Sequence, residues 1–278
     1  MTADTARENS LAGPVVRLKD VAVGYGGKAV MSGISIDVQR GEIVVLCGGS
    51  GSGKTTTLRT LIGLIAVVSG SIEIEGKPLD LGDPTSLEAL RRRYGVMYQL
   101  GALFGGMTLL ENVRLPLEEF TQLPRQAMDE IARGKLALVG LGNDIHKLPS
   151  GISGGMQKRA AIARALALDP PLVFLDEPSA GLDPVTSADL DQLLLTLNRS
   201  LGTTFVLVTH ELRSIFAIAG RVVMLDAQSK RMVAVGTPAE LRDHCPNPWV
   251  RGFLKAASSA ELAKEASALN DRKGTLAP

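Results

Sequence analysis

The stretch Gly48-Gly49-Ser50-Gly51-Ser52-Gly53-Lys54-Thr55 decides the fold class of this chain. It fits the phosphate-loop pattern G-x-x-x-x-G-K-[ST] at every defined position. Glycines let backbone N–H groups converge on phosphate oxygens without a Cβ in the way. The plainer alternative is a glycine-rich turn that binds nothing. The pattern predicts a loop that holds the phosphates of a nucleotide.

The residues on either side of this loop supply the context that such a loop needs. Residues 42–47 form a short apolar run typical of a buried strand, and residues 56–64 place apolar side chains at helical spacing. The helix adds unpaired N–H groups and its positive end to the site. Lys54 is predicted to reach the β- and γ-phosphates, Thr55 to bind Mg²⁺, and Thr56 to belong to the same nucleotide site.

A second apolar run, residues 172–177, ends in two carboxylates, Asp176 and Glu177. Acidic residues at the carboxyl end of a parallel strand lie where α/β proteins bind ligands. In proteins with a phosphate loop, an aspartate at that place holds Mg²⁺. Asp176 is therefore a predicted metal ligand, and Glu177 is placed toward the γ-phosphate and an attacking water. Without a phosphate loop, a strand that leaves the sheet through a charged turn would explain the pair equally well.

Three further positions carry weaker signals. His210 ends the β-rich run 203–209, where it is a candidate γ-phosphate contact, although a lone histidine is more often structural. Ser153 is a natural N-cap for an alanine-rich helix, and the poor helix formers Gly154 and Gly155 beside it suggest that a ligand approaches there. A plain capped helix is the alternative. Tyr25, in a turn between the predicted strands 15–23 and 34–38, is either an adenine-stacking residue or a half-exposed turn tyrosine.

Composition narrows the class of protein. The 278 residues are 45% hydrophobic and carry a net charge of +1, which gives no reason to expect a nucleic-acid partner. The two cysteines, Cys47 and Cys245, lie far apart, suggest neither a metal site nor a disulfide, and fit a reducing compartment. No apolar run approaches the ~20 residues of a membrane span. If the protein works at a membrane, another chain supplies the spanning part.

These motifs follow one another in an order that resembles the ATP-binding cassette family of transport ATPases, over residues 15–235. The resemblance implies an α/β fold: a RecA-like phosphate-loop core, a small antiparallel β subdomain and an α-helical subdomain. The ATPase domain is expected over residues 15–246, with the helical subdomain inserted at about 100–168. Residues 247–278 are then a C-terminal extension, formed by a helix and a disordered tail.

The resemblance also implies roles for individual residues. Tyr25 becomes the adenine-stacking position, and Gln99, Glu177 and His210 the catalytic residues. Gln99 joins Thr55 and Asp176 at Mg²⁺. Nucleotide contacts are also expected from the signature residues Ser153, Gly154, Gly155 and Met156. Asp183, in the loop that follows Asp176 and Glu177, is expected to contact the nucleotide as well.

The same resemblance implies cofactors and partners. These are ATP and Mg²⁺, a second copy of the chain in a head-to-tail dimer with two ATP at the interface, and a membrane permease. The chain is then expected at the cytoplasmic face of the cell membrane. Because each signature helix faces the γ-phosphate held by the other subunit, hydrolysis would let the dimer open.

Departures from the common family pattern point to one branch. The signature reads Ile152-Ser153-Gly154-Gly155-Met156 where Leu-Ser-Gly-Gly-Gln is common, and the loop 99–104 reads QLGALF. With residues 107–108, 111–113 and 247–254, these resemble the lipid-transport ATPases that work with MCE proteins, the Mla and Mce group. The branch implies lipid cargo, an MCE-domain partner and a small STAS-type subunit.

Other functions compete with this interpretation. A small-solute importer, for example of an amino acid, remains the main alternative. A soluble cassette of DNA repair or translation would be expected to carry a second cassette, a coiled-coil insertion or basic extensions, and a non-hydrolysing module to lack Lys54 or Glu177.

Two surface contacts are also predicted. Leu103 and Phe104 are expected at the permease contact, unless both turn inward. A helix capped by Asn247 is expected to carry Trp249, Phe253 and Leu254 near one face, packed either on its own core or across to a partner.

Overall fold

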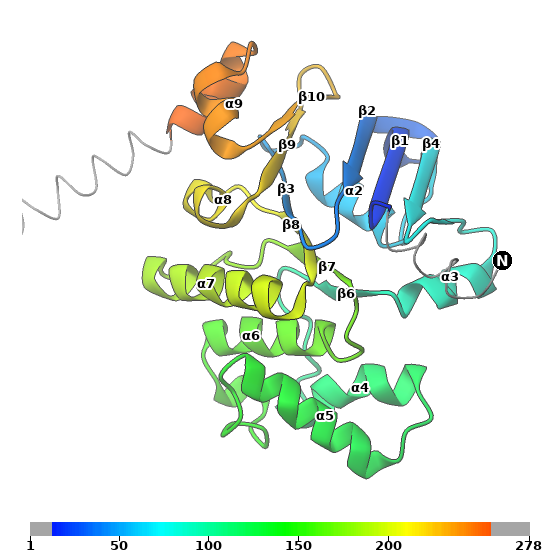
Figure 1. Cartoon of the computed structure of the whole chain (residues 1–278), viewed down its shortest axis with the longest axis vertical. Helices are drawn as coiled ribbons and strands as arrows, with labels where there is room; N and C mark the ends of the chain where they lie inside the picture. Colours follow the sequence, from blue (N-terminus) through cyan, green and yellow to red (C-terminus); the bar gives the residue numbers. More distant parts are fainter. Residues whose placement is uncertain (1–12, 257–278) are drawn as a thin grey trace, which may run out of the picture.

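The computed structural model describes residues 13–256, and within this range ten strands form one sheet (Figure 1). The strands are β1 (Val16–Tyr25), β2 (Lys28–Val38), β3 (Ile43–Gly48), β4 (Val67–Ile74), β5 (Lys77–Pro78), β6 (Tyr94–Met97), β7 (Leu172–Asp176), β8 (Thr204–Val208), β9 (Arg221–Asp226) and β10 (Arg231–Gly236). Their order across the sheet is β5-β4-β1-β2-β10-β9-β3-β8-β7-β6.

The central part of the sheet is parallel. Strand β3 pairs in parallel with β8 and β9, and β7 pairs in parallel with β8 and β6. All six residues of β3 are buried, because Val44 and Leu46 face one hydrophobic cluster while Val45 and Cys47 face the other. A strand covered on both faces has no polar side to show, which is why residues 42–47 read as a continuous apolar run.

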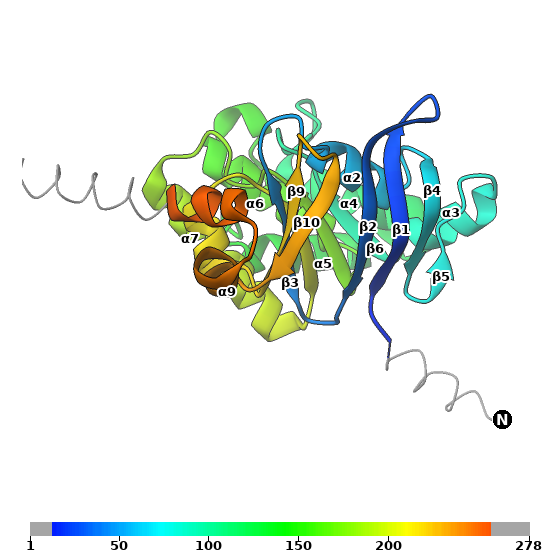
Figure 2. The same cartoon turned by 90° about the horizontal axis from the view of Figure 1, so that it is seen from above.

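An antiparallel ribbon of β1, β2, β4 and β5 continues the sheet, as the resemblance implied (Figure 2). It joins the parallel part through a single residue pair, Arg231 of β10 with Ser32 of β2. The prediction that the second strand begins at Ile34 is wrong, because β2 begins at Lys28. Gly33, in the left-handed region at φ 66, interrupts the alternation of buried and exposed residues and hides the first half of the strand.

Helices cover both faces of the sheet. They are α2 (Lys54–Leu61), α3 (Pro84–Arg91), α4 (Leu109–Phe120), α5 (Arg125–Leu138), α6 (Gly154–Ala165), α7 (Pro184–Leu201), α8 (Leu212–Ile218) and α9 (Pro238–His244), with a 3-10 turn η1 (Pro149–Gly151) and a last helix over residues 248–256. The sequence analysis named no helix at α3. Figure 1 shows α4, α5 and α6 gathered at one end of the molecule. These three lie inside the predicted helical insertion, and the domain boundaries themselves stay a prediction.

Two prolines in the helical insertion behave differently. Pro116 lies inside α4, whereas Pro124 is the N-cap of α5. The capping box of Thr108 and Glu111 fixes the first turn of α4. Helix α4 therefore continues past Pro116 to Phe120, and only Pro124 marks a helix boundary.

Asn112 holds the glycine-rich loop in front of α4. This fully buried side chain accepts a hydrogen bond from the Phe104 N–H at 2.7 Å and donates to the carbonyls of Phe104, Met107 and Thr108 at 3.0–3.1 Å. The two residues are placed differently, because Leu103 packs on the core while Phe104 stays 52% exposed, and their contact with a permease stays a prediction. Leu100, 87% exposed, is the second apolar side chain presented to solvent there.

The last helix begins as expected but presents different faces. The Asn247 side chain accepts from the Trp249 N–H at 3.0 Å, which is an N-cap bond, and Pro248 follows it. Val250 and Leu254 are fully buried in the core, while Trp249 is 37% exposed and stacks near Phe253. Leu254 therefore does not share a face with Trp249. The predicted disordered tail lies outside the described residues.

The contacts of Asn112 give a stability prediction. The change Asn112→Ala removes the acceptor of the Phe104 N–H and the donor to three backbone carbonyls, so we expect the free energy of unfolding to fall by about 2–3 kcal/mol. Urea unfolding of the variant measures this loss. Asn143→Ala is the matched control, since Asn143 is exposed in the same helical region. Equal stability of the two variants would show that the Asn112 network contributes nothing.

Candidate functional site

The candidate site lies where four neighbouring parallel strands end. Leu46 of β3 is level with Val208 of β8, Val208 with Asp176 of β7, and Leu175 of β7 with Met97 of β6. The segments that follow these strands are the phosphate loop, residues 209–210, Glu177 and residues 98–99. Since parallel strands end at one edge of the sheet, motifs far apart in the sequence come together there.

The phosphate loop is held in shape by its own lysine. The Lys54 ammonium donates to the carbonyl oxygens of Gly48 and Gly49, each at 2.9 Å. A Cβ on Gly48 would stand 2.2 Å from the Leu225 carbonyl oxygen, so no other residue fits there. Gly51 and Gly53 adopt left-handed backbones at φ 74 and 76. The thiol of Cys47 beneath the loop is inert, because burial raises its pKa to about 12.

Three buried oxygens at this edge have no hydrogen-bond partner. They are Ser52 Oγ, Asp176 Oδ1 and Glu177 Oε2. Burial, and next the charge of Glu177, raise the pKa of Asp176. A buried oxygen without a partner is costly, and a cation or a donor group would relieve that cost. Hydroxyl and carboxylate oxygens are the ligands that Mg²⁺ prefers, so the residues fit the ion that the resemblance implies.

Glu177 is held in an unusual backbone conformation. Its φ is 48°, a left-handed value that costs a residue with a side chain of order 1–3 kcal/mol. The Glu177 N–H donates to Val208 O at 2.8 Å, which extends the β7–β8 pairing by one residue. The turned backbone directs Oε1 to His210 Nδ1 at 2.8 Å. The structure thus brings Glu177 and His210 together, with the histidine side chain 64% exposed and the carboxylate 12% exposed.

A buried lysine that the sequence analysis missed joins two of the motifs. Lys158 of α6 donates to the Gln99 carbonyl oxygen and, at 3.4 Å, to the Glu177 carbonyl oxygen. Its pKa is lowered because burial disfavours the charged form. Lys158 is five residues beyond Ser153, in a helix that also carries Arg159 and Arg164. Its sequence neighbours therefore do not distinguish it from a basic residue on the surface. Only the packing of α6 under the loop after β6 gives it these partners.

Arg164, one turn and a half further along α6, fixes the same loop. It donates to the carbonyls of Gly101 and Ala102, each at 2.7 Å. Gln99 itself is exposed, and its backbone carbonyl is the group that is held. The side chain predicted to reach Mg²⁺ is therefore presented from an anchored backbone.

The signature residues form the start of α6. Ser153 is the N-cap, and its hydroxyl accepts from the Met156 N–H at 3.3 Å. Ser153 and Gly154 are exposed, whereas Met156 packs partly on the core. Gly155 has a reason that the sequence analysis did not foresee: a Cβ there would stand 2.5 Å from Thr186 Cγ2, so the glycine lets α6 pack against α7.

Asp183 caps α7. Its carboxylate accepts from the N–H groups of Val185 and Thr186 at 3.0 Å and from the Thr186 hydroxyl at 2.5 Å. The Thr186 bonds, with that of Val185, lower the pKa of Asp183. In this structure its carboxylate is engaged in the cap.

Tyr25 lies beside the first turns of α2. Side-chain hydrogen bonds from Thr56, and then from Arg59, lower the pKa of its phenol. The ring is 51% exposed. The structure therefore places Tyr25 next to Thr56 with an open face, although β1 belongs to the antiparallel ribbon.

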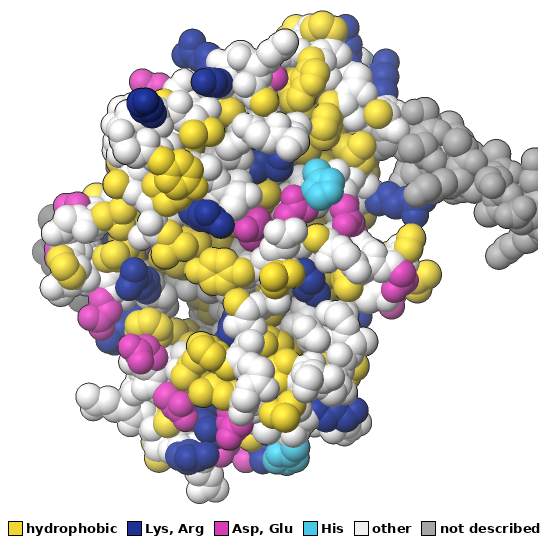
Figure 3. Space-filling view, turned by 180° about the vertical axis from the view of Figure 1, so that it is seen from behind, with side chains coloured by type: hydrophobic (Ala, Val, Ile, Leu, Met, Phe, Trp, Pro, Cys, Tyr) yellow, Lys and Arg dark blue, Asp and Glu magenta, His cyan; other side chains and the backbone are white. Residues whose placement is uncertain are grey.

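Figure 3 shows acidic and basic side chains gathered beside a histidine on one face of the molecule.

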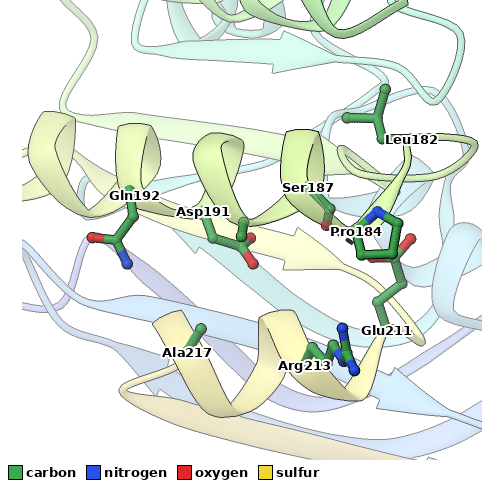
Figure 4. Close-up of a pocket in the computed structure, with 9 residues that line it drawn as sticks. Leu182, Pro184, Ser187, Asp191, Gln192, Glu211, Arg213 and Ala217 are labelled. Carbon is green, nitrogen blue, oxygen red and sulfur yellow. Dashed lines mark hydrogen bonds between the residues drawn. The ribbon is translucent and has the colours of Figure 1, made fainter. Parts of the chain in front are cut away.

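A cavity of about 330 Å³ separates α7 from α8 behind the histidine segment (Figure 4). Ser187 donates to Glu211 at 3.2 Å across its rim, and Asp191 points into it with only 5% of the residue exposed. Burial, together with the charge of Glu211, raises the pKa of Asp191 from 3.8 to about 6, and the Ser214 hydroxyl offsets part of that rise. The sequence analysis predicted none of these residues as part of the site. It predicted only two residues close to them in sequence, Asp183 and His210.

The buried carboxyl of Asp191 gives a pH prediction. Because its pKa is higher in the folded state, its contribution to stability is present at low pH and is lost as the pH rises from about 4 to about 6. Asp191→Asn keeps the shape and stays neutral. We expect the variant to melt above the wild type at pH 7.5, with a difference that shrinks toward pH 4.5.

Thermal melts at both pH values measure this, with Asp189→Asn as the control because Asp189 is exposed on the same helix. A difference between Asp191→Asn and wild type that is the same at both pH values would contradict the prediction.

Known proteins place the chain in a family. The ABC transporter family model matches residues 31–180. The chain is 40% identical over 240 residues to the intermembrane phospholipid transport system ATP-binding protein MlaF of Escherichia coli, covering 86% of this chain and 88% of that protein. It is 39% identical over 242 residues to the probable ribonucleotide transport ATP-binding protein mkl of Mycobacterium tuberculosis, covering 87% and 67%. It is 42% identical over 213 residues to the methionine import ATP-binding protein MetN of Rhizobium johnstonii, covering 77% and 59%.

Solved structures agree with the fold. The cassette cbiO1 of Clostridium perfringens, part of an ABC transporter complex, superposes with a TM-score of 0.77 at 26% identity, covering 84% of this chain and 92% of that one. The dimeric cassette MJ0796 bound to ADP and Pi superposes with a TM-score of 0.71 at 31% identity, covering 80% and 98%. The mixed α/β architecture, the matched family model and these relatives together show that the chain belongs to the ABC transporter family, as an ATP-binding, ABC-type ATPase subunit.

Proposed function

We propose that this ATPase subunit powers the transport of a lipid through a separate membrane permease. The observation that carries the catalytic part is the convergence of Lys54, Asp176, Glu177 and His210 at one edge of the parallel sheet. The lipid part is supported by the Ile152–Met156 signature, by the 99–104 loop and by the identity to MlaF over most of both chains.

Binding of ATP begins with a change of partner for Lys54. Its ammonium is poised on the carbonyls of Gly48 and Gly49, and it would exchange these for the β- and γ-phosphate oxygens. Thr55, Asp176 and Gln99 are the residues that would hold Mg²⁺. When bound, the ion neutralises charge on the phosphates. Tyr25, beside Thr56, offers its open ring face to the adenine.

Hydrolysis depends on the acid–histidine pair. Glu177 is proposed as the general base, or the group that polarises the attacking water. His210, bonded to its carboxylate, orients that group and contacts the γ-phosphate. Lys158 contributes from below, because it fixes the backbone of Glu177 and of Gln99 together. We therefore propose Lys158 as a positioning residue for both.

The signature residues would complete the site of a second copy. Ser153 and Gly154 are exposed at the start of α6, where unpaired N–H groups and the helix dipole favour an anion. MJ0796, which superposes on this chain, is a dimeric cassette. We propose a head-to-tail homodimer in which Ser153 to Met156 and Asp183 of one chain meet the nucleotide of the other.

The permease contact is proposed at a hollow of about 510 Å³ beside the 98–104 loop. Phe104 and Tyr98 line it together with Phe120 of α4, and Arg164 forms part of its floor. Phe104 is 52% exposed and Tyr98 39% exposed, and exposed aromatic side chains in a hollow suit a partner helix. The same loop presents Gln99 to the nucleotide. A permease bound here would therefore respond to whether the site holds ATP.

The membrane partners follow from the proposed cargo. No helix within residues 13–256 is long and apolar enough to cross a membrane. We propose that the chain binds the cytoplasmic face of the cell membrane through its permease. An MCE-domain protein and a small STAS-type subunit complete the complex, and the exposed Trp249–Phe253 face of the last helix is a contact for the partner ATPase or for that small subunit.

A small-solute importer is the second candidate function. The 42% identity to MetN favours it, although the match covers 59% of that protein. The name of mkl, at 39% identity, points to a third kind of cargo. The ATPase site is compatible with all three, so the cargo has to be tested in the assembled complex.

The first prediction concerns the base. Glu177→Gln keeps the shape of the side chain and removes its basic carboxylate, so turnover should fall by roughly 10²–10⁴-fold. ATP binding should survive, and the dimer should be trapped closed. Turnover is measured in the assembled complex by phosphate release. A rate close to wild type would rule out the role of Glu177.

A second prediction concerns Lys158. Lys158→Met keeps a side chain of similar length and removes the hydrogen bonds to the carbonyls of Gln99 and Glu177. We therefore expect kcat to fall by about 10–100-fold with little change in ATP affinity. Arg159→Met is the control: it is on the same helix and also donates to a backbone carbonyl, that of Val139. Similar kcat losses in both variants would indicate only a general weakening of α6.

The cargo prediction is tested on the native complex. Purification through this chain, followed by lipid mass spectrometry, should recover phospholipid in excess of the detergent background. The Glu177→Gln complex, trapped before hydrolysis, is compared with the wild type and should hold a different amount of lipid. Lipid-free complexes whose ATPase activity rises with a small solute would instead support the importer.

A further inference from the structure

The acidic residue that follows His210 is bonded to a neighbouring helix. The Ser187 hydroxyl of α7 donates to Glu211 Oε2 at 3.2 Å, and Figure 4 shows the two side chains turned toward each other at the rim of the cavity between α7 and α8. Ser187 is 9% exposed and Glu211 is half-buried. The sequence analysis gave neither residue a role.

The side chain of Glu211 does not serve its own helix. Glu211 is the N-cap of α8, yet its side chain makes no capping bond. An acidic side chain at a helix N-terminus can stabilise that helix through its free N–H groups and its dipole. Here the carboxylate accepts from α7 instead, so it joins the two helices.

The backbone around His210 is fastened on both sides. The hydroxyl of Thr209, which is buried, accepts from the Glu211 N–H at 3.1 Å and closes a turn over His210. The Glu211 carbonyl accepts from the Ile215 N–H of α8 at 3.1 Å. The His210 side chain is 64% exposed and bonds Glu177 Oε1 at 2.8 Å. Because an exposed ring has little packing around it, its place depends on the backbone that carries it.

The other end of the bond lies close to a second residue of the proposed site. Asp183 caps α7 with its carboxylate, and its carbonyl accepts from the Ser187 N–H at 2.9 Å. Ser187 therefore belongs to the first turn of the helix that Asp183 begins. A displacement of Asp183 on dimer closure would pass through this single turn to Ser187, and through the hydroxyl to Glu211.

We propose that Glu211 is a positioning residue for His210, and that the Ser187–Glu211 hydrogen bond links the histidine segment to the start of α7. This inference rests on the proposed roles of His210 and Asp183 in the ATPase site. It adds a connection within one chain between the residue that meets the partner's nucleotide and the residue that meets the chain's own. Binding of the partner at Asp183 then adjusts His210.

Turnover in the assembled complex tests the bond. Ser187→Ala and Glu211→Ala each remove it, so we expect kcat for ATP hydrolysis to fall about 5–20-fold, with the KM for ATP changed less than about twofold. Ser187→Thr keeps a hydroxyl and Glu211→Gln keeps an acceptor oxygen, so both should recover most of the loss. Thr196→Ala is the control and should turn over like the wild type, since Thr196 is exposed on the same helix and donates to the Gln192 carbonyl within it.

A second background shows whether the bond acts through His210. His210→Ala should itself lower kcat, and adding Ser187→Ala to it should lower kcat no further. The double variant Ser187→Ala/Glu211→Ala should likewise lose no more than either single variant. A general weakening of the packing between α7 and α8 would instead add to the loss of His210→Ala and would lower the melting temperature.

The outcomes separate this inference from the proposed function. Wild-type kcat in both Ser187→Ala and Glu211→Ala, or losses that add in full to that of His210→Ala, would overturn the inference and leave the proposed site intact. Failure of both Ser187→Thr and Glu211→Gln to recover turnover would overturn it as well. A His210→Ala variant that turns over like the wild type would contradict the proposed role of His210, and the inference would fall with it.

Discussion

The parallel register of β3, β8, β7 and β6 determines where the chemistry can take place. Strands β3, β7 and β8 are buried throughout, β6 is buried except at Val96, and each strand ends within two residues of its neighbour. The segments that follow them therefore emerge side by side. A shift of one strand by a single residue would turn its side chains to the opposite face of the sheet, which burial on both faces forbids. The spacing between the phosphate loop, Glu177 and His210 is thus a property of the core.

Helix α6 adds a second layer of control through its basic side chains. Lys158 and Arg164 are both buried enough for their pKa values to be lowered, and both donate to backbone carbonyls at the carboxyl edge of the sheet. Buried cations are costly unless well bonded, so their geometry is closely defined. The helix that opens with Ser153 in this way holds the backbone on which Gln99 and Glu177 sit.

Much of this arrangement could be predicted from the sequence, because the phosphate loop and the acidic pair each stand next to a strand that is apolar throughout. The architecture and the ATPase activity are confirmed, while the individual site roles stay predictions. Lys158 escaped because its partners are distant backbone groups, which leave no local mark. The sequence analysis took Gly155 as a sign that a ligand approaches the start of the helix. In the structure, a Cβ at Gly155 would instead meet Thr186 of α7. The strand β2 was cut short because Gly33 interrupts its alternation.

The single backbone pair between β10 and β2 has a consequence for how the molecule opens. Hydrogen exchange reports which parts of a protein open together as cooperative units. The boundary between two such units is expected where a single residue pair joins them, as between β10 and β2. Side chains of both parts also meet in one hydrophobic cluster, which includes Val16 of β1 and Leu46 of β3. Tyr25 belongs to the ribbon and Lys54 to the parallel part. A nucleotide gripped by both would tie the two units together, so amides of β1 and β2 should exchange more slowly whenever the site is filled.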